Sequence, residues 1–331
     1  MRILIAGLGS IGRRHLANLH LLDPGADVTV WRQHSSPDAP LPDLVGKPRL
    51  VYRAEDALAA RPDVAFVTGP AASHISTARL LAGEGISLFI EKPLSHNMDG
   101  VDDMIDVCRR QSRVLMVGYN LRFHEPLRRM RQALLDGAIG RLLAIRAEAG
   151  MYLPDWRAGT DYRVGVSARS DLGGGAVLEL SHELDYVRWI AGEVKSVCAF
   201  TGRLSDLEMD VEDTADILLR FHSGVTGSIH IDMIQRAPVR LCRLIGTEGT
   251  LVWDGIANSV KMYSAASKTW SELCASSGMD RNQTYLAEAT HFLDCVKNRH
   301  EPMVSGEDGR RALAIALAVK RSSGEQKWLA V

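Results

Sequence analysis

The chain has 331 residues, 46% of them hydrophobic and 24% charged. These proportions are typical of a globular protein with about two domains. A formal net charge of -1 gives no general attraction to nucleic acid or to an anionic membrane. The apolar stretches are too short to cross a bilayer, and no signal-peptide pattern follows Met1. The five cysteines form no CxxC pair, so we expect reduced thiols in a cytoplasmic protein and no metal site.

The first third of the chain alternates short β-branched runs with amphipathic segments. We expect strands at 2–6, 28–32, 64–68, 86–90 and 114–118, and helices at 73–83 and 99–110. Such alternation predicts βαβ units around a parallel sheet, the doubly wound class of α/β fold. Four prolines between positions 37 and 48 predict a loop there.

The pattern changes after residue 119. We expect a helix at 126–136, a strand at 141–148, a polar aromatic loop at 150–172 and one helix at 176–191 that Gly192 ends. Strand pairs 215–221 with 226–233, and 240–246 with 250–253, flank short turns and predict antiparallel hairpins. Helices at 282–297 and 306–321 close the chain. The expected domains are 1–119 and 120–331, with the last helix packing back on the first domain.

A Gly-x-Gly-x-x-Gly fingerprint follows the first strand and opens a helix. Its first glycine allows a tight turn, its second lets the backbone approach a pyrophosphate, and its third lets the helix pack closely. The helix N-terminus stabilises the phosphate charge. The motif predicts dinucleotide binding by Gly7, Leu8, Gly9, Ser10, Ile11 and Gly12. The alternative is a glycine-rich turn without a ligand.

The end of the second strand bears on the choice of cofactor. An acidic residue there would accept the ribose hydroxyls of NAD, but the segment from Val30 to Ser35 holds none. Arg32 and Ser35 instead suit the 2′-phosphate of NADP. The sequence therefore favours NADP over NAD, the alternative being a solvated arginine.

Glu91-Lys92-Pro93 ends the apolar strand at 86–90. A lysine at the carboxyl end of a parallel strand points toward the crevice where these sheets bind ligands. Pro93 favours an extended backbone at Lys92, which fixes the direction of its side chain. We expect Lys92 to lie where nicotinamide and substrate meet, rather than to be a surface lysine.

Six motifs are spread along the whole chain. They are Gly7 to His15, Pro70 with His74, Glu91-Lys92-Pro93, Gly118-Tyr119-Asn120-x-Arg122-Phe123, Gly173-Gly174-Gly175, and His182-x-x-Asp185 with Trp189. In this combination the chain resembles the glucose–fructose oxidoreductase, inositol dehydrogenase and rhizopine catabolism family (Gfo/Idh/MocA). The resemblance implies a Rossmann domain followed by a substrate-binding and oligomerisation α/β domain with an open, mostly antiparallel sheet. It also implies hydride transfer at a sugar or cyclitol carbinol, and homodimers or homotetramers formed through that sheet.

The same resemblance assigns roles to residues. Lys92 is the catalytic or substrate-polarising lysine, and His182 is the acid–base histidine. The family's aspartate, four residues before that histidine, is replaced by Leu178, and Glu179 is the nearest acid. Because helix positions three apart share a face, Glu179 is expected as a substitute. The cofactor is also expected to contact Gly69, Pro70, His74 and Glu91.

Two groups are candidates for the proton transfer that accompanies hydride transfer. His182 has an ordinary pKa near 6.5, which suits a base at neutral pH. Lys92 either stabilises negative charge on the substrate oxygen or, if desolvated, acts as the base itself. For His182 the alternative is a structural histidine paired with Asp185.

We expect the loop at 150–172 to bind and select the substrate. Aromatic rings stack on sugars and arginines bind carboxylate or phosphate, so an anionic substrate such as a uronic acid or nucleotide sugar is one interpretation. The alternative is that these arginines pair with Asp155, Asp161 and Asp171. The expected substrate-binding residues beside Lys92 and His182 are Asn120, Arg122, Tyr152, Trp156, Tyr162, Arg163 and Arg169.

The sequence thus predicts an NAD(P)-dependent oxidoreductase of a cyclic sugar or sugar derivative. A dehydrogenase of inositol or another neutral polyol is the alternative among enzymes. A catalytically silent dinucleotide-binding sensor or scaffold is the alternative from another class.

Overall fold

The computed structural model describes residues 1–33, 43–157, 159–275, 278 and 280–331. The chain divides into two compact units. The first comprises Met1–Asn120 and Arg281–Arg310, and the second Leu121–Asp280 and Arg311–Val331. The expected second domain was 120–331, with its last helix packing back on the first domain, whereas residues 281–310 belong to the first unit and residues 311–331 to the second. Within the described ranges, no helix has both the length and the apolar character needed to cross a bilayer.

The first unit is built on a six-stranded parallel sheet with the order β3-β2-β1-β4-β5-β6. Strands β1, β4 and β5 are buried almost throughout, because helices cover both faces of the sheet. This confirms the predicted doubly wound fold. The strands are β1 (Arg2–Ala6), β2 (Asp27–Trp31), β3 (Arg49–Val51), β4 (Val64–Val67), β5 (Ser87–Glu91) and β6 (Leu115–Gly118).

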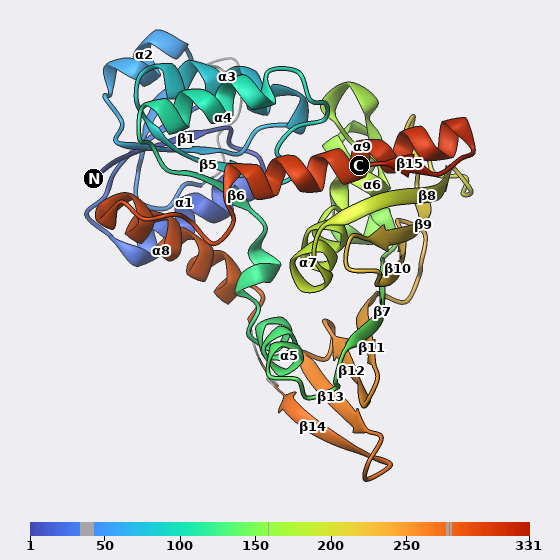
Figure 1. Ribbon diagram of the computed structural model, residues 1–331. Helices are drawn as coiled ribbons and strands as arrows, with labels where there is room; N and C mark the ends of the chain where they lie inside the picture. The colour runs from blue at the N-terminus through green and yellow to red at the C-terminus, as the bar shows by residue number, and fades with distance from the viewer. Residues whose placement is uncertain (34–42, 158, 276–277, 279) are drawn as a thin grey trace. The chain divides into compact units, whose positions relative to one another are not determined.

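Helices α1 (Ser10–Leu22) and α8 (Asn282–Asn298) lie on one face of this sheet, and α3 (Ala71–Gly83) and α4 (Val101–Arg110) on the other (Figure 1). A short helix, α2 (Ala54–Ala59), precedes β4. From α8, the ring of Phe292 packs edge-on against Phe66 and Phe89, with centroids 5.4 and 5.7 Å apart. These aromatic contacts explain why a segment so late in the chain belongs to the first unit.

The second unit contains a nine-stranded sheet with the order β14-β13-β12-β11-β7-β10-β9-β8-β15. Every pair is antiparallel except β7 with β10. This confirms the open, mostly antiparallel sheet and both predicted hairpins. The strands are β7 (Leu142–Gly150), β8 (Val194–Gly202), β9 (Thr214–Phe221), β10 (Thr226–Asp232), β11 (Val239–Gly246), β12 (Gly249–Asp254), β13 (Ser259–Ser264), β14 (Thr269–Ala275) and β15 (Leu329–Ala330).

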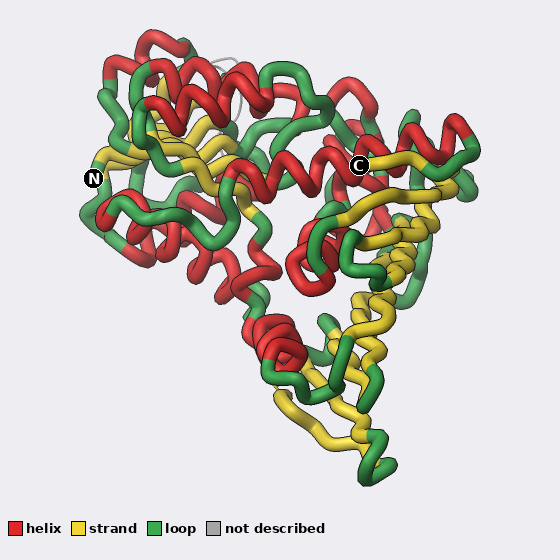
Figure 2. The backbone as a smooth tube through the Cα atoms, viewed as in Figure 1, coloured by secondary structure: helices red, strands yellow, loops and turns green. Residues whose placement is uncertain are grey.

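The two faces of this sheet differ. The strand register aligns Ile217, Ile229 and Trp253 in one buried row. Helices α5 (Glu125–Leu135) and α7 (His182–Ala191) lie on one side of the strands, as Figure 2 shows. On the opposite face Leu218 and Phe200 are each 52% exposed. The sheet therefore has a covered face and an open face.

The prediction of a single helix over 176–191 is wrong. The structure has a short helix, α6 (Ala176–Glu179), then a turn at Leu180 and Ser181 before α7 begins. Different tertiary contacts hold the two pieces: the Glu212 carbonyl accepts from the Ala176 N–H at 2.9 Å, while α7 carries Asp185, which pairs with Arg122. The predicted end at Gly192 is confirmed, with a φ of 95°.

The loop at 150–172 contains four short 3₁₀ turns, at Leu153–Trp156, Tyr162–Val164, Val166–Ala168 and Ser170–Leu172. Another 3₁₀ turn, Asn120–Phe123, precedes α5.

The last helix, α9 (Gly306–Glu325), contains residue 310, where the chain passes from the first unit to the second. All five cysteines are free thiols, as expected.

A buried ion pair joins the start of the second unit to α7. Arg122 donates from Nε to Asp185 Oδ2 at 2.9 Å and from Nη2 to Oδ1 at 2.6 Å. The two side chains are only 3% and 1% exposed. The guanidinium also lies 5.7 Å from the centroid of the Trp189 ring. Two parallel charge-assisted hydrogen bonds fix both direction and distance, so this pair orients α7.

We predict that Asp185→Ala lowers the free energy of unfolding by about 3–5 kcal/mol, because it leaves a buried guanidinium without its carboxylate. Urea denaturation of the full chain measures this loss. The matched control is Arg163→Ala, whose pair with Asp161 is about half exposed and should be worth about 1 kcal/mol or less. Equal losses in the two variants would contradict a special role for the buried pair.

Candidate functional site

The glycine turn after β1 is shaped by backbone contacts that leave no room for side chains. Gly7 has a φ of 111°, and a Cβ there would lie 2.7 Å from the nitrogen of Gly69. A Cβ on Gly12 would lie 2.2 Å from the Gly7 carbonyl oxygen. The predicted mechanical roles of these glycines, a tight turn and close helix packing, are therefore confirmed.

Gly9 differs from its neighbours because a Cβ there would meet nothing within 4 Å. It is the N-cap residue of α1, and no side chain caps the helix. Gly9 and Ser10 are exposed, while Leu8 and Ile11 are half-buried. The first turn of α1 thus presents backbone N–H groups and the positive end of the helix dipole to an open space, the arrangement that binds phosphate.

This turn lies at the point where the strand order reverses, since β1 stands between β2 and β4. Ligands of open α/β sheets bind at such a point, beyond the carboxyl ends of the strands. After β4, the Thr68 hydroxyl donates to the Gly7 carbonyl at 2.8 Å and brings Gly69 and Pro70 beside the turn. Gly7, Gly69 and Pro70, all expected to contact the cofactor, therefore lie together at one edge of the sheet.

His74 connects two of the loops at this edge. It is 1% exposed, and its Nε2 and Nδ1 lie 2.9 Å from the Gly69 carbonyl and 3.0 Å from the Pro93 carbonyl. Burial lowers the pKa of His74, against these hydrogen bonds. The sequence placed His74 at the cofactor, whereas its ring nitrogens contact backbone. Within the first unit it positions the loops that carry Gly69 and Lys92.

Arg32 follows β2 and is 8% exposed. Its guanidinium lies 5.7 Å from the centroid of the Tyr52 ring. The next residue, Gln33, donates to the Thr77 hydroxyl at 2.8 Å. Ser35 lies outside the described residues. The described residues at the end of β2 thus include an arginine and an amide but no carboxylate.

Lys92 follows β5, at the same edge of the sheet as the glycine turn, and is half-buried. The preceding Glu91 turns inward: its Oε1 lies 2.7 Å from His15 Nε2, and its Oε2 accepts from the Lys92 N–H at 3.2 Å. Glu91 was expected at the cofactor, but these contacts give it a different task. It connects α1, the helix that begins at the glycine turn, to the residue that follows β5.

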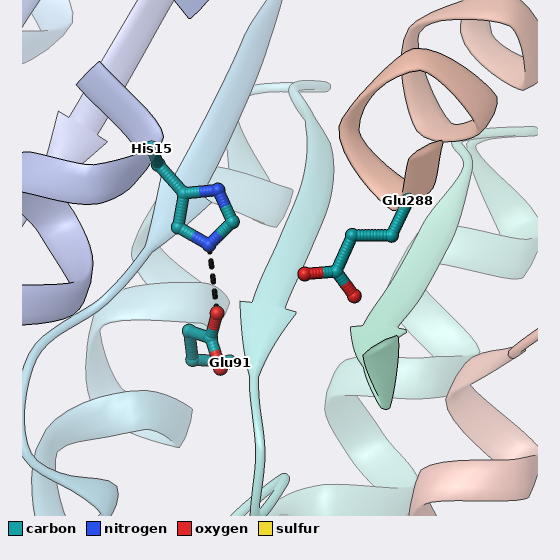
Figure 3. A group of neighbouring side chains, drawn as sticks. All are labelled: His15, Glu91 and Glu288. Carbon is teal, nitrogen blue, oxygen red and sulfur yellow. Dashed lines mark hydrogen bonds and ion pairs between the residues drawn. The ribbon is translucent and has the colours of Figure 1, made fainter. Parts of the chain in front are cut away.

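Glu288 is a third member of this cluster that sequence reasoning missed. It reaches from α8 toward His15 and Glu91, and the nearest ligand atoms of the three lie within 4.8 Å of one another (Figure 3). Burial, followed by the charge of Glu91, raises the pKa of Glu288 well above its usual range. One signal was available: Glu288 lies among Tyr285, Ala289 and Phe292, on the apolar stripe of its helix.

These three groups are also close enough together to hold a metal ion, and among the described residues no other cluster of this kind is found. Two carboxylates this close in a protein interior repel by about 3 kcal/mol. Either a bound cation or a proton on one of the carboxyl groups would relieve the repulsion between the two carboxylates. Because burial favours the neutral form of Glu288, we interpret the cluster as a site that holds a proton.

In the second unit, His182 is the first residue of α7 and is 8% exposed. Glu179 ends α6 and accepts from the Ser167 hydroxyl at 3.1 Å. Because the helix is broken between them, their spacing of three no longer places them on one helical face. The reason for choosing Glu179 as a substitute acid is therefore lost. Both carboxylate oxygens of Asp185 accept hydrogen bonds from Arg122.

Two residues expected at the substrate are held by partners within their own units. Asn120, 4% exposed, donates to the Thr284 hydroxyl at 2.7 Å. Arg122 forms the buried ion pair with Asp185. Their side chains connect elements of the fold within those units.

The two expected loop arginines pair with acids close in sequence. Arg163 contacts Asp161 at 2.9 Å, and Arg169 contacts Asp171 at 2.6 Å. Hydrogen bonds from Arg163 lower the pKa of Asp161, which keeps that carboxyl ionised. Both pairings are those of the alternative interpretation, so these arginines give no specific support for an anionic substrate.

The aromatic residues of the loop pack against an apolar cluster that includes Leu153, Met209 and Met233. Trp156 donates to the Met151 carbonyl at 2.9 Å, and the Tyr162 hydroxyl accepts from the Glu208 N–H at 3.0 Å. Tyr152 lies under the guanidinium of Arg236, at 3.5 Å. All three rings are half-buried, so each retains some accessible surface.

Comparison with known proteins agrees with both units. A family model described as an oxidoreductase family with an NAD-binding Rossmann fold matches residues 1–119, and one described as a GFO/IDH/MocA C-terminal domain matches residues 127–252. The chain is 29% identical to the myo-inositol 2-dehydrogenase of Thermotoga maritima, over 99% of this chain and 97% of that protein.

Solved structures extend the likeness to the whole fold. A levoglucosan dehydrogenase in complex with NADH and levoglucosan matches with a TM-score of 0.87 at 20% identity, covering 100% of this chain and 99% of that one. The WlbA dehydrogenase from Bordetella pertussis, in complex with NADH and UDP-GlcNAcA, matches with a TM-score of 0.83 at 20% identity, covering 100% and 97%. The chain belongs to the Gfo/Idh/MocA family of NAD-binding oxidoreductases.

Proposed function

We propose that this protein is a dehydrogenase that transfers a hydride between nicotinamide and a carbinol carbon of a neutral cyclic sugar or polyol. One observation carries the proposal: the open glycine turn and Lys92 lie at the same edge of one parallel sheet. The full-length similarity to a myo-inositol dehydrogenase supports a neutral substrate, and so do the acids that pair with Arg163 and Arg169.

The chemistry requires a hydride acceptor and a proton acceptor. A bound nicotinamide supplies the first. For the second we propose His182, with Lys92 donating a hydrogen bond to the substrate oxygen as negative charge develops there. Deprotonation by Lys92 itself is the alternative. We assign no proton transfer to Glu179, because the broken helix removes the argument for it.

For the cofactor we propose a nicotinamide dinucleotide bound by its phosphates at the first turn of α1. The absence of a carboxylate beside Arg32, within the described residues, supports acceptance of the 2′-phosphate of NADP. The NADH in the complexes of levoglucosan dehydrogenase and WlbA supports NAD. We propose that both are accepted and that Arg32 determines the affinity for NADP.

We also propose that the protein forms homodimers or homotetramers through the open face of the nine-stranded sheet. Leu218 and Phe200 are large apolar side chains exposed on adjacent strands of that face. Such exposed apolar surface is typical of an interface between subunits.

The enzyme hypothesis predicts a change in nicotinamide absorbance with at least one neutral member of a panel of inositols, sugars, uronic acids and nucleotide sugars. Lys92→Ala should lower kcat by about 10²–10⁴-fold, because a polarising group is lost. Lys297→Ala, an exposed lysine of α8, is the control. Turnover of anionic members alone would favour the anionic substrate, and cofactor binding without any turnover would favour a silent sensor.

The cofactor hypothesis predicts that Arg32→Ala weakens NADP binding by about tenfold, the loss of one charge-assisted contact, and leaves NAD binding close to wild type. Titration calorimetry with the two cofactors measures the difference. Equal effects on both would show that Arg32 acts through the fold and not through the 2′-phosphate.

The interface hypothesis predicts that Leu218→Asp shifts the protein toward monomer, because it places a charge in an apolar contact. Light scattering after size exclusion gives the mass. Leu135→Asp, at a residue 60% exposed and outside this sheet, is the matched control. An unchanged mass for Leu218→Asp would rule out an interface at this position.

A further inference from the structure

Three side chains from distant parts of the chain meet inside the first unit. His15 comes from α1, Glu91 ends β5 and Glu288 comes from α8, and they are 0%, 6% and 0% exposed (Figure 3). The rings of Phe66 and Phe89 lie 5.2 and 5.1 Å from the His15 ring. In these surroundings a charge is stable only where hydrogen bonds or an opposite charge compensate it.

The two carboxyl groups differ sharply in this respect. Glu91 has two hydrogen-bonding neighbours, His15 Nε2 at 2.7 Å and the Lys92 N–H at 3.2 Å. Neither oxygen of Glu288 has a hydrogen-bond partner among the described residues, although its ligand atom lies within 4.8 Å of those of His15 and Glu91. Hydrogen bonds to a carboxylate favour its charged form, and burial without them favours the neutral acid. Of the two groups, Glu288 is therefore the one that keeps a proton.

The other ionisable groups around Glu288 do not reverse this assignment. Arg14 is exposed, and its guanidinium lies 4.5 Å from the ring centroid of Tyr285, on the same helix as Glu288. Its charge lowers the pKa of Glu288, but less than burial and Glu91 raise it. Tyr285 is itself kept neutral, since burial raises its pKa, and Arg281 adds positive charge near the start of α8.

We propose that Glu288 is a positioning residue for Lys92: as a neutral carboxylic acid it directs its hydroxyl proton toward the Glu91 carboxylate and holds the end of β5 in place. In this proposal Glu91 gains a third donor, from α8, beside its two neighbours in the structure, His15 and the Lys92 backbone, and its rotamer is fixed. Glu288 touches neither substrate nor cofactor. The inference rests on the proposed role of Lys92 at the reacting carbon.

The protonation state is tested first, by a measurement that needs no turnover. Infrared spectra of the protein with ¹³C-labelled glutamate at neutral pH should contain the carbonyl stretch of a buried carboxylic acid. Glu288→Gln should remove this band, while Glu84→Gln, at an exposed position in the same unit, should leave it. A wild-type spectrum without the band would overturn the proposal, even if the variant fails to fold. A chelatable divalent ion held by the cluster would also overturn it.

The pH dependence of stability tests the protonation of Glu288 independently. A carboxyl group whose pKa is raised on folding contributes stability below its unfolded pKa, near 4.5, and that contribution is lost as pH rises toward the folded value. Glu288→Gln cannot titrate. Its melting temperature relative to wild type should therefore rise between pH 5 and pH 8.5, whereas that of Glu84→Gln should stay constant. A constant difference for Glu288→Gln would contradict the assignment.

Kinetics test the connection to Lys92. The amide of Glu288→Gln still donates a hydrogen bond, so kcat should remain near wild type. Glu288→Met has similar size but no donor, and Glu91→Gln loses the charge, so each should lower kcat about tenfold with unchanged cofactor affinity. Equal kcat in Glu288→Gln and Glu288→Met would contradict the positioning role. If Lys92→Ala retains full activity, the proposed role of Lys92 fails instead, and the infrared band still reports the proton.

Discussion

The close packing of three backbone segments at the end of β1 is the constraint on which the first unit depends. Gly7 lies against Gly69, and Gly12 lies against the Gly7 carbonyl, at distances that exclude any Cβ. This packing fixes where α1 begins and at what angle it leaves the sheet. It also places His15, one turn further along α1, within 2.7 Å of Glu91. The helix that begins at the glycine turn and the residue that follows β5 are thus connected through one buried hydrogen bond.

The second unit is organised by a different interaction. The buried pair of Arg122 and Asp185 orients α7, and α7 begins with His182. The acids that pair with Arg163 and Arg169 show how a loop rich in charge is neutralised locally. Residues of types that bind sugars or phosphates can therefore have structural tasks. What distinguishes Lys92 and the glycine turn is their place at the carboxyl edge of a parallel sheet, where oxidoreductases of this architecture bind ligands.

Much of the fold could be predicted from local patterns. Strand β1 was placed to the residue, and β2, β4, β5 and β6 to within one residue at each end, because buried parallel strands are nearly continuous apolar runs. The short strand β3 and the strands β8, β13 and β14 were missed, since their mixed composition carries no clear period. The break between α6 and α7 was missed for another reason. The contacts of Glu212 and Arg122 decide it, and both residues lie far from the break in sequence.

The sequence by itself determined the family, the parallel sheet with its glycine turn, and the place of Lys92, because these depend on motifs and periods that neighbouring residues carry. Only the tertiary structure decided what Glu91, His74, Asn120 and Arg122 contact, and only it revealed Glu288. Those outcomes depend on which side chains meet after distant segments pack together. A carboxyl group becomes a proton holder or an ion-pair partner according to its burial and its neighbours, and a linear sequence specifies neither directly.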